Sequence, residues 1–111
     1  MNTTSDQDKP TLLLVDDDEA FRRVLARAME RRGYAVSTAA DVPEALAAAQ
    51  QHPPEYAVVD LKMPGESGLV LIERLIELDP NTRVVMLTGY ASIATAIEAI
   101  KLGATHYLAK P

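Results

Sequence analysis

The sequence predicts an α/β fold with a doubly wound, five-stranded parallel sheet, and three observations lead to this expectation. Short apolar runs alternate with segments of helical periodicity, in the order β-α-β-α-β-α-β-α-β. The runs at 11–15, 56–59 and 84–87 are continuously apolar, as expected for strands that are buried on both faces of a parallel sheet. Right-handed helical crossovers between such strands place helices on both faces of the sheet.

The first third of the chain contains two predicted strands with a helix between them. The strand at 11–15 ends in acidic residues, of which Asp18 is expected to cap the helix that follows. Gly33 ends this helix in the position of a C′ glycine, and the alternating segment 34–38 is typical of an edge strand. The polar face of the helix is basic, and we expect its arginines to be solvated: Arg22, Arg23, Arg27, Arg31 and Arg32.

Capping residues and apolar periodicity define the remaining elements. Asp41 and Glu44 form a capping box at the start of the second helix, and Pro43 fits its first turn. The segment 107–109 is a short fifth strand. Two more helices are indicated by apolar residues at helical spacing: Leu69, Ile72, Leu75 and Ile76 for the third, and Ile93, Ala96, Ile97 and Ile100 for the fourth.

Length and composition exclude several classes of protein. The 111 residues, 48% of them hydrophobic, fit a flexible leader at 1–10 and one domain at 11–111. The chain has no Cys, and two His, expected at the surface, cannot complete a zinc site. The net charge of −5 argues against direct nucleic acid binding by this segment. No apolar run approaches the roughly 20 residues that span a bilayer, and no signal peptide is present, so we expect a cytoplasmic domain without membrane contact.

Polar side chains follow four of the predicted strands, at the point where each strand ends. Asp16 and Asp17 follow the first strand, Asp60 the third, Thr88 the fourth and Lys110 the fifth. Each of them alone could be an ordinary turn or surface residue. In open α/β sheets, however, ligands bind outside the carboxyl ends of the strands, so we expect these side chains to gather at one edge of the sheet.

Such a cluster has the composition of a phosphoryl-transfer site. Carboxylates that lie close together repel one another and attract a cation. Without thiolate or imidazole ligands, that cation is expected to be Mg²⁺, with Mn²⁺ as the alternative, rather than zinc. A carboxylate beside Mg²⁺ can attack phosphorus and form an aspartyl phosphate. Lys110 and Thr88 then supply positive charge and a donor to the transferred group.

Four motifs, taken together and in order, resemble the receiver domains of bacterial two-component response regulators. They are Leu-Val-Asp-Asp-Asp at 14–18, Val-Asp-Leu-Lys-Met-Pro-Gly-Glu-Ser-Gly at 59–68, Met-Leu-Thr-Gly-Tyr-Ala at 86–91 and Gly-Ala-Thr-His-Tyr-Leu-Ala-Lys-Pro at 103–111. The resemblance implies a flavodoxin-like sheet with strand order 2-1-3-4-5. Receivers normally continue into a fifth helix, which this sequence lacks, so we expect a domain truncated before that helix.

The resemblance implies that Asp60 is the phosphoacceptor for a sensor histidine kinase, which often docks on the first helix of such domains. Asp16, Asp17 and Asp60 would be metal ligands, with Asp17 the more direct of the acidic pair, and the backbone carbonyl of Lys62 would complete the protein's share of the shell. Lys62 and Tyr90 would line the path of the hydrolytic water. Because both are bulky and neither orients water well, we expect a long-lived phosphoryl group.

The resemblance also implies a conformational switch. Thr88 and Lys110 would bind phosphoryl oxygens, and a cis bond between Lys110 and Pro111 would help to aim the ammonium group. Thr88 would move toward the phosphate, and Tyr107 would turn inward into the space that it leaves. The face formed by the fourth helix and fifth strand would then change, and a homodimer could form through it.

The segment 87–101 most resembles that of transcriptional regulators. The resemblance is greatest to redox-responsive global regulators with a Fis-like helix-turn-helix output. Nitrogen-control regulators with an ATPase output share much of the segment and are the second choice. In this interpretation the chain catalyses only its own phosphotransfer and slow autodephosphorylation, and the output domain is absent from it. One alternative is an Asp-nucleophile phosphohydrolase, which would carry a second Asp where Lys62 stands. Another is a nucleotide- or flavin-binding domain, but the sequence contains no glycine-rich loop for the phosphates. The last is a purely structural pseudo-receiver.

Overall fold

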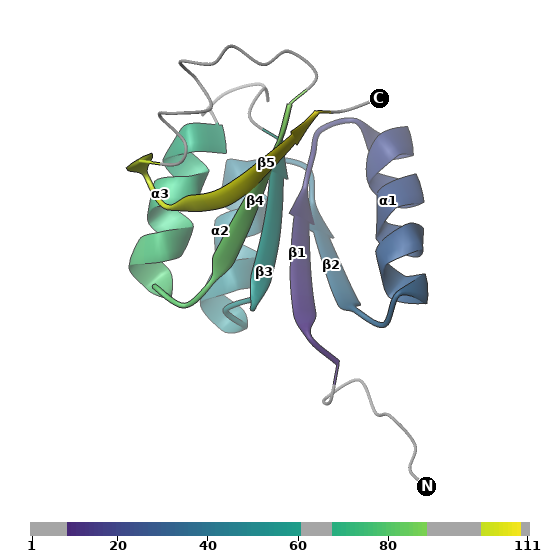
Figure 1. Ribbon diagram of the computed structural model, residues 1–111, viewed down its shortest axis with the longest axis horizontal. Coiled ribbons are helices and arrows are strands. Elements are labelled where there is room, and N and C mark those ends of the chain that lie inside the picture. The colour runs from purple at the N-terminus through teal and green to yellow at the C-terminus, as the bar shows by residue number, and fades with distance from the viewer. Residues whose placement is uncertain (1–8, 61–67, 89–100, 110–111) are drawn as a thin grey trace, which may run out of the picture.

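The computed structural model describes residues 9–60, 68–88 and 101–109, which form an α/β fold with helices on both faces of a parallel sheet (Figure 1). The sheet order is β2-β1-β3-β4-β5, which confirms the predicted doubly wound sheet and its strand order. The predicted fourth helix, 93–100, lies outside the described residues. In chain order, the elements are β1 (Thr11–Val15), α1 (Glu19–Arg31), β2 (Ala35–Ala39), α2 (Val42–Gln51), β3 (Tyr56–Asp60), α3 (Gly68–Leu78), β4 (Arg83–Thr88) and β5 (Ala104–Ala109).

The strand β1, which lies between β2 and β3, shows why the apolar runs do not alternate. Leu13 and Val15 face the larger core, which lies beneath α2 and α3. Leu12 and Leu14 face the opposite side, where α1 covers the sheet (Figure 1). All four side chains are at most 3% exposed, so both faces of the strand have to be apolar. The smaller core is completed by buried Leu87 and by partly buried residues: Phe21, Leu25, Ala26, Met29, Tyr34, Val36, Tyr56 and Val58.

Local hydrogen bonds determine where α1 begins and ends. The Asp18 carboxylate accepts a hydrogen bond from the Phe21 N–H at 3.1 Å, which satisfies one of the free donors in the first turn of the helix. At the other end, Arg32 is the C-cap and Gly33 has a φ of 99°, which is favourable for glycine alone among common residues. The predicted cap and the predicted stop are both confirmed. As a result, only three residues separate the end of β1 from the start of α1.

The second helix begins in a similar way at the same end of the sheet. The Asp41 carboxylate accepts a hydrogen bond from the Glu44 N–H at 2.9 Å, and Glu44 Oε1 accepts one from the Ala40 N–H at 2.8 Å. This is the predicted capping arrangement, except that the Glu44 side chain reaches the residue before the cap. Across the described residues, no helix combines the length and the apolar character needed to cross a bilayer.

A separate set of hydrogen bonds ties the amino ends of β1, β3 and β4 together. The Thr82 hydroxyl donates to the Pro54 carbonyl at 2.7 Å, and Thr82 is only 4% exposed. The Thr11 hydroxyl accepts from the Glu55 N–H at 2.9 Å, and the Arg83 N–H donates to the Glu55 carbonyl at 2.9 Å. Polar groups at this end of the sheet are therefore satisfied by other parts of the chain.

Candidate functional site

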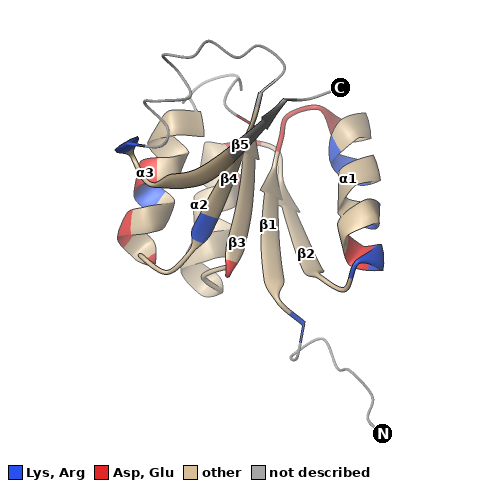
Figure 2. Ribbon diagram, in the orientation of Figure 1, with Lys and Arg blue, Asp and Glu red and all other residues tan. Residues whose placement is uncertain are grey.

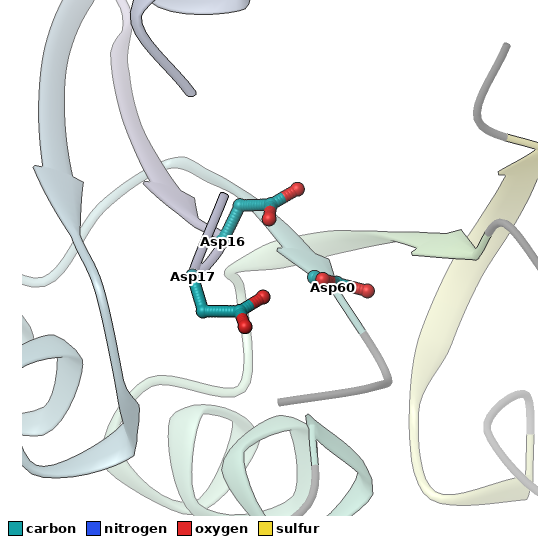
Figure 3. A group of neighbouring side chains, drawn as sticks. All are labelled: Asp16, Asp17 and Asp60. Atoms are coloured by element: carbon teal, nitrogen blue, oxygen red, sulfur yellow. The ribbon is translucent and has the colours of Figure 1, made fainter. Parts of the chain in front are cut away.

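Three carboxylates meet at the carboxyl end of the sheet, opposite the end where Thr82 lies. Asp16 and Asp17 follow β1, and Asp60 is the last residue of β3, the neighbour of β1 in the sheet (Figure 3). Each of the three offers a carboxylate oxygen, and these oxygens lie within 4.8 Å of one another. Asp16 is 0% exposed and Asp60 is 2% exposed, whereas Asp17 is exposed. The fold thus brings together acids that are 44 positions apart in the sequence, counted from Asp16 to Asp60.

The turn that carries the first two acids is held by three hydrogen bonds. The Asp16 N–H donates to the Ala39 carbonyl at 3.1 Å, which extends the pairing of β1 with β2 by one residue. The Asp16 Oδ1 accepts from the Asp18 N–H at 2.9 Å. The Asp16 carbonyl accepts from Arg22 Nη1 at 2.6 Å. The main chain around Asp16 is therefore fixed from β2, from the turn itself and from α1.

The bond from Arg22 corrects an expectation based on the sequence. Helical periodicity placed Arg22 on the solvated basic face of α1, but its side chain is half-buried and reaches the turn after β1. Long side chains on a helix lean toward the N-terminus, so a residue in the first turns can contact the segment that precedes the helix. The position of an arginine four residues after the Asp18 cap was the one available signal in the sequence.

The donor set fits a hard divalent cation. The described cluster offers carboxylate oxygens, the ligands that Mg²⁺ and Ca²⁺ prefer, and the chain has no Cys. His52 and His106 are exposed, as expected. Two of the three carboxylates are buried beside each other, which is costly unless positive charge or hydrogen bonds compensate them. Figure 2 shows that the acidic stretch joining β1 to α1 lies at this end of the sheet.

The other residues predicted for the site are described only in part. Thr88 is the last residue of β4, directly after Leu87, which pairs with Asp60, so its backbone lies at the same edge of the sheet as the acids. Tyr107 lies in β5, next to β4. For Thr88 and Tyr107, the structure describes the backbone and not the side chain. The rest of the predicted set lies outside the described residues: Lys62, Tyr90, Lys110 and the bond between Lys110 and Pro111.

Comparison with known proteins identifies relatives over almost the whole chain. The photosynthetic apparatus regulatory protein RegA of Cereibacter sphaeroides is 55% identical over 101 residues, which are 91% of this chain and 55% of that protein. The acid tolerance regulatory protein ActR of Rhizobium meliloti is 54% identical over 91% of this chain and 52% of its own length. The chain therefore spans about half the length of the curated relatives it matches.

Solved structures agree with these sequence relatives. A crystal structure of a response regulator protein from Burkholderia pseudomallei, described with a phosphorylated aspartic acid, calcium ion and citrate, has a TM-score of 0.88 and 51% sequence identity. The alignment covers 92% of this chain and 60% of that one. The family model of the response regulator receiver domain matches residues 12–111. These findings do not favour the alternative of a phosphohydrolase, and the chain belongs to the family of response regulator receiver domains.

Proposed function

We propose that Asp60 accepts a phosphoryl group with the help of a divalent cation, and that this modification switches a regulatory protein. The supporting observation is the position of Asp60, which is 2% exposed at the end of β3 with two further carboxylates close enough to share a cation. The Burkholderia pseudomallei relative, described with a phosphorylated aspartic acid and a calcium ion, supports the same chemistry. A buried carboxylate in such a cluster is partly shielded from water, which favours attack on phosphorus over hydrolysis.

The proposed cation is Mg²⁺, with Mn²⁺ as a substitute. Asp16, Asp17 and Asp60 would hold it together with the backbone carbonyl of Lys62. When bound, the cation supplies positive charge that offsets the three carboxylates and the oxygens of the incoming phosphoryl group. The all-oxygen donor set of the described cluster supports this choice of metal.

The chain's own residues carry out the transfer. An oxygen of the Asp60 carboxylate forms the new O–P bond while the P–N bond to a phosphohistidine of a sensor kinase breaks, and the departing imidazole takes up a proton. Thr88 and Lys110 donate to the phosphoryl oxygens. The chain thus catalyses only its own modification, and Lys62 and Tyr90 slow the loss of the group because neither orients a water for attack.

The surface of α1 supports docking of such a kinase. Val24 is 69% exposed there, and the exposed arginines Arg23 and Arg27 lie on either side of it in the sequence. An apolar side chain among cationic groups suits a partner with an apolar and acidic surface. Only three residues separate this helix from β1, so a kinase bound to it would lie near Asp60.

Phosphorylation would then change the position of Thr88 and Tyr107 and, with them, the face that includes β5. This is a shift between existing conformations, driven by the new charge. RegA and ActR are named regulatory proteins, and this chain spans about half the length of each, which supports an output region in addition to the receiver. We propose that this output acts on transcription. The net charge of −5 argues against direct binding of nucleic acid by this segment. We further propose that it acts in the cytoplasm without membrane contact, and that a homodimer forms through the face of the fourth helix and β5.

The decisive experiment is labelling with acetyl phosphate and Mg²⁺, followed by mass spectrometry. Wild-type protein should gain the mass of one phosphoryl group that is lost in acid, and Asp60→Asn should gain none. Asp18→Asn is the matched control, because Asp18 lies beside the cluster but caps α1, and Asn caps a helix equally well. Equal labelling of Asp60→Asn would contradict the proposal, and steady turnover of an aryl phosphate ester would favour a phosphohydrolase instead.

A further inference from the structure

We propose that Arg22 is a positioning residue for the metal site, an inference that rests on the proposed function. Its guanidinium Nη1 donates a hydrogen bond of 2.6 Å to the main-chain carbonyl of Asp16. Arg22 is half-buried and lies in the second turn of α1, whereas the acids lie in the turn before that helix. The contact therefore connects the first turns of α1 to the peptide that carries the acidic pair.

The bonded carbonyl belongs to the peptide group that joins Asp16 to Asp17. Because a peptide group is planar, fixing the direction of this carbonyl also fixes where the chain of Asp17 departs. Asp16 is further held through its N–H and its carboxylate, by Ala39 and Asp18. Asp17 is the exposed member of the cluster, so its carboxylate depends most on the orientation of the backbone beneath it.

The charge of Arg22 allows this role to be separated from simple electrostatics. A cation near a metal site repels the metal, so Coulomb's law alone predicts tighter metal binding when the arginine is removed. Positioning predicts the opposite result, because a ligand left without its support binds the metal less well. The two explanations therefore differ in the sign of the effect.

The experiment is titration of the whole chain with Mn²⁺, in which the electron paramagnetic resonance signal of free Mn²⁺ gives the Kd. Arg22→Ala should raise the Kd about tenfold, at the lower end of the range found when residues that support metal ligands are removed. Arg22→Lys keeps the charge and one donor at a shorter reach, and should recover part of the affinity. Arg23→Ala is the matched control: Arg23 is the next residue of α1, and its guanidinium pairs with the exposed Glu19 at 3.0 Å.

An Arg22→Ala protein that binds Mn²⁺ as tightly as the wild type, or more tightly, overturns the proposal. An equal loss of affinity in Arg23→Ala also overturns it, because the effect would then be a general one on α1. Circular dichroism checks that each variant is folded. If Arg22→Ala is not folded, the Kd for Mn²⁺ is compared between Arg22→Lys and Arg23→Lys, and only Arg22→Lys should bind Mn²⁺ more weakly than the wild type. Wild-type protein that binds no Mn²⁺ would refute the proposed metal site itself, whereas normal wild-type binding with an unchanged Arg22→Ala would refute only the role of Arg22.

Discussion

The two ends of the parallel sheet differ in the kind of polar group that they bury. At the amino end, Thr82 is buried and donates to the carbonyl of Pro54, and Thr11 accepts from the N–H of Glu55. At the carboxyl end, two acids of like charge, Asp16 and Asp60, are almost fully buried within reach of each other. The polar groups at the first end bring no like charges together, whereas the carboxylates at the second end do, so that a cation bound there relieves their repulsion.

Because of this difference, polar residues at the amino end stabilise the fold, whereas those at the carboxyl end serve binding. Buried polar groups that bond within the chain stabilise the fold and leave nothing for a partner to bind. Buried like charges destabilise the empty protein and give a cation or a phosphoryl group its binding energy. Substitutions at the amino end should therefore change unfolding alone, and those at the carboxyl end should change unfolding and binding in opposite directions.

The largest effect on stability should come from Mg²⁺ itself. A cation that binds only the folded protein raises the free energy of unfolding by about 2.7 kcal/mol when its free concentration is a hundredfold above the Kd. Asp17→Ala should remove most of this increment, because a ligand is lost. Urea unfolding followed by circular dichroism, with Mg²⁺ and with a chelator, measures both quantities. If Mg²⁺ raises the free energy of unfolding of Asp17→Ala as much as that of the wild type, the proposed difference between the two ends of the sheet is wrong.

At the amino end, Thr82→Val should lower the free energy of unfolding by about 2 kcal/mol. The change keeps the shape of the side chain but leaves the carbonyl of Pro54, itself buried, without its donor. Thr11→Val is the matched control and should cost about 0.5 kcal/mol, because its bond to the Glu55 N–H is exposed. In both variants, Mg²⁺ should raise the free energy of unfolding as much as it does in the wild type. A loss of metal binding in either variant would mean that the two ends of the sheet are coupled.

The effect expected at Asp60 is smaller than that of Mg²⁺ or of Thr82→Val, but it is the most diagnostic for the carboxyl end. In the presence of a chelator, Asp60→Asn should raise the free energy of unfolding by about 1 kcal/mol, because one of the close negative charges is removed. With saturating Mg²⁺, the order should reverse and the wild type should be the more stable protein. The expected result is therefore that Asp60→Asn is the more stable protein with chelator and the wild type is the more stable protein with Mg²⁺. If Asp60→Asn is less stable in both conditions, the acids are held by the chain rather than by a cation.

Much of this fold and site could be predicted because the signals are local or follow a general rule. The caps Asp18 and Asp41 and the stop at Gly33 depend on residues within one turn of each other. The meeting of Asp16 with Asp60 follows from the rule that parallel strands present their carboxyl ends at one edge. The roles expected of Thr88 and Tyr107 depend on side-chain positions and remain predictions.

By itself, the sequence determined which segments become strands and helices and which end of the sheet gathers the acids, since periodicity, caps and strand ends are written in neighbouring residues. Only the tertiary structure decided which polar side chains contact residues outside their own helix or turn. Arg22 and Arg23 are neighbours in the sequence and were both expected to be solvated, yet Arg22 reaches the carbonyl of Asp16 whereas Arg23 pairs with Glu19. A hydrogen bond such as that of Thr82 joins residues 28 positions apart, and its geometry exists only once the layers of the fold are packed.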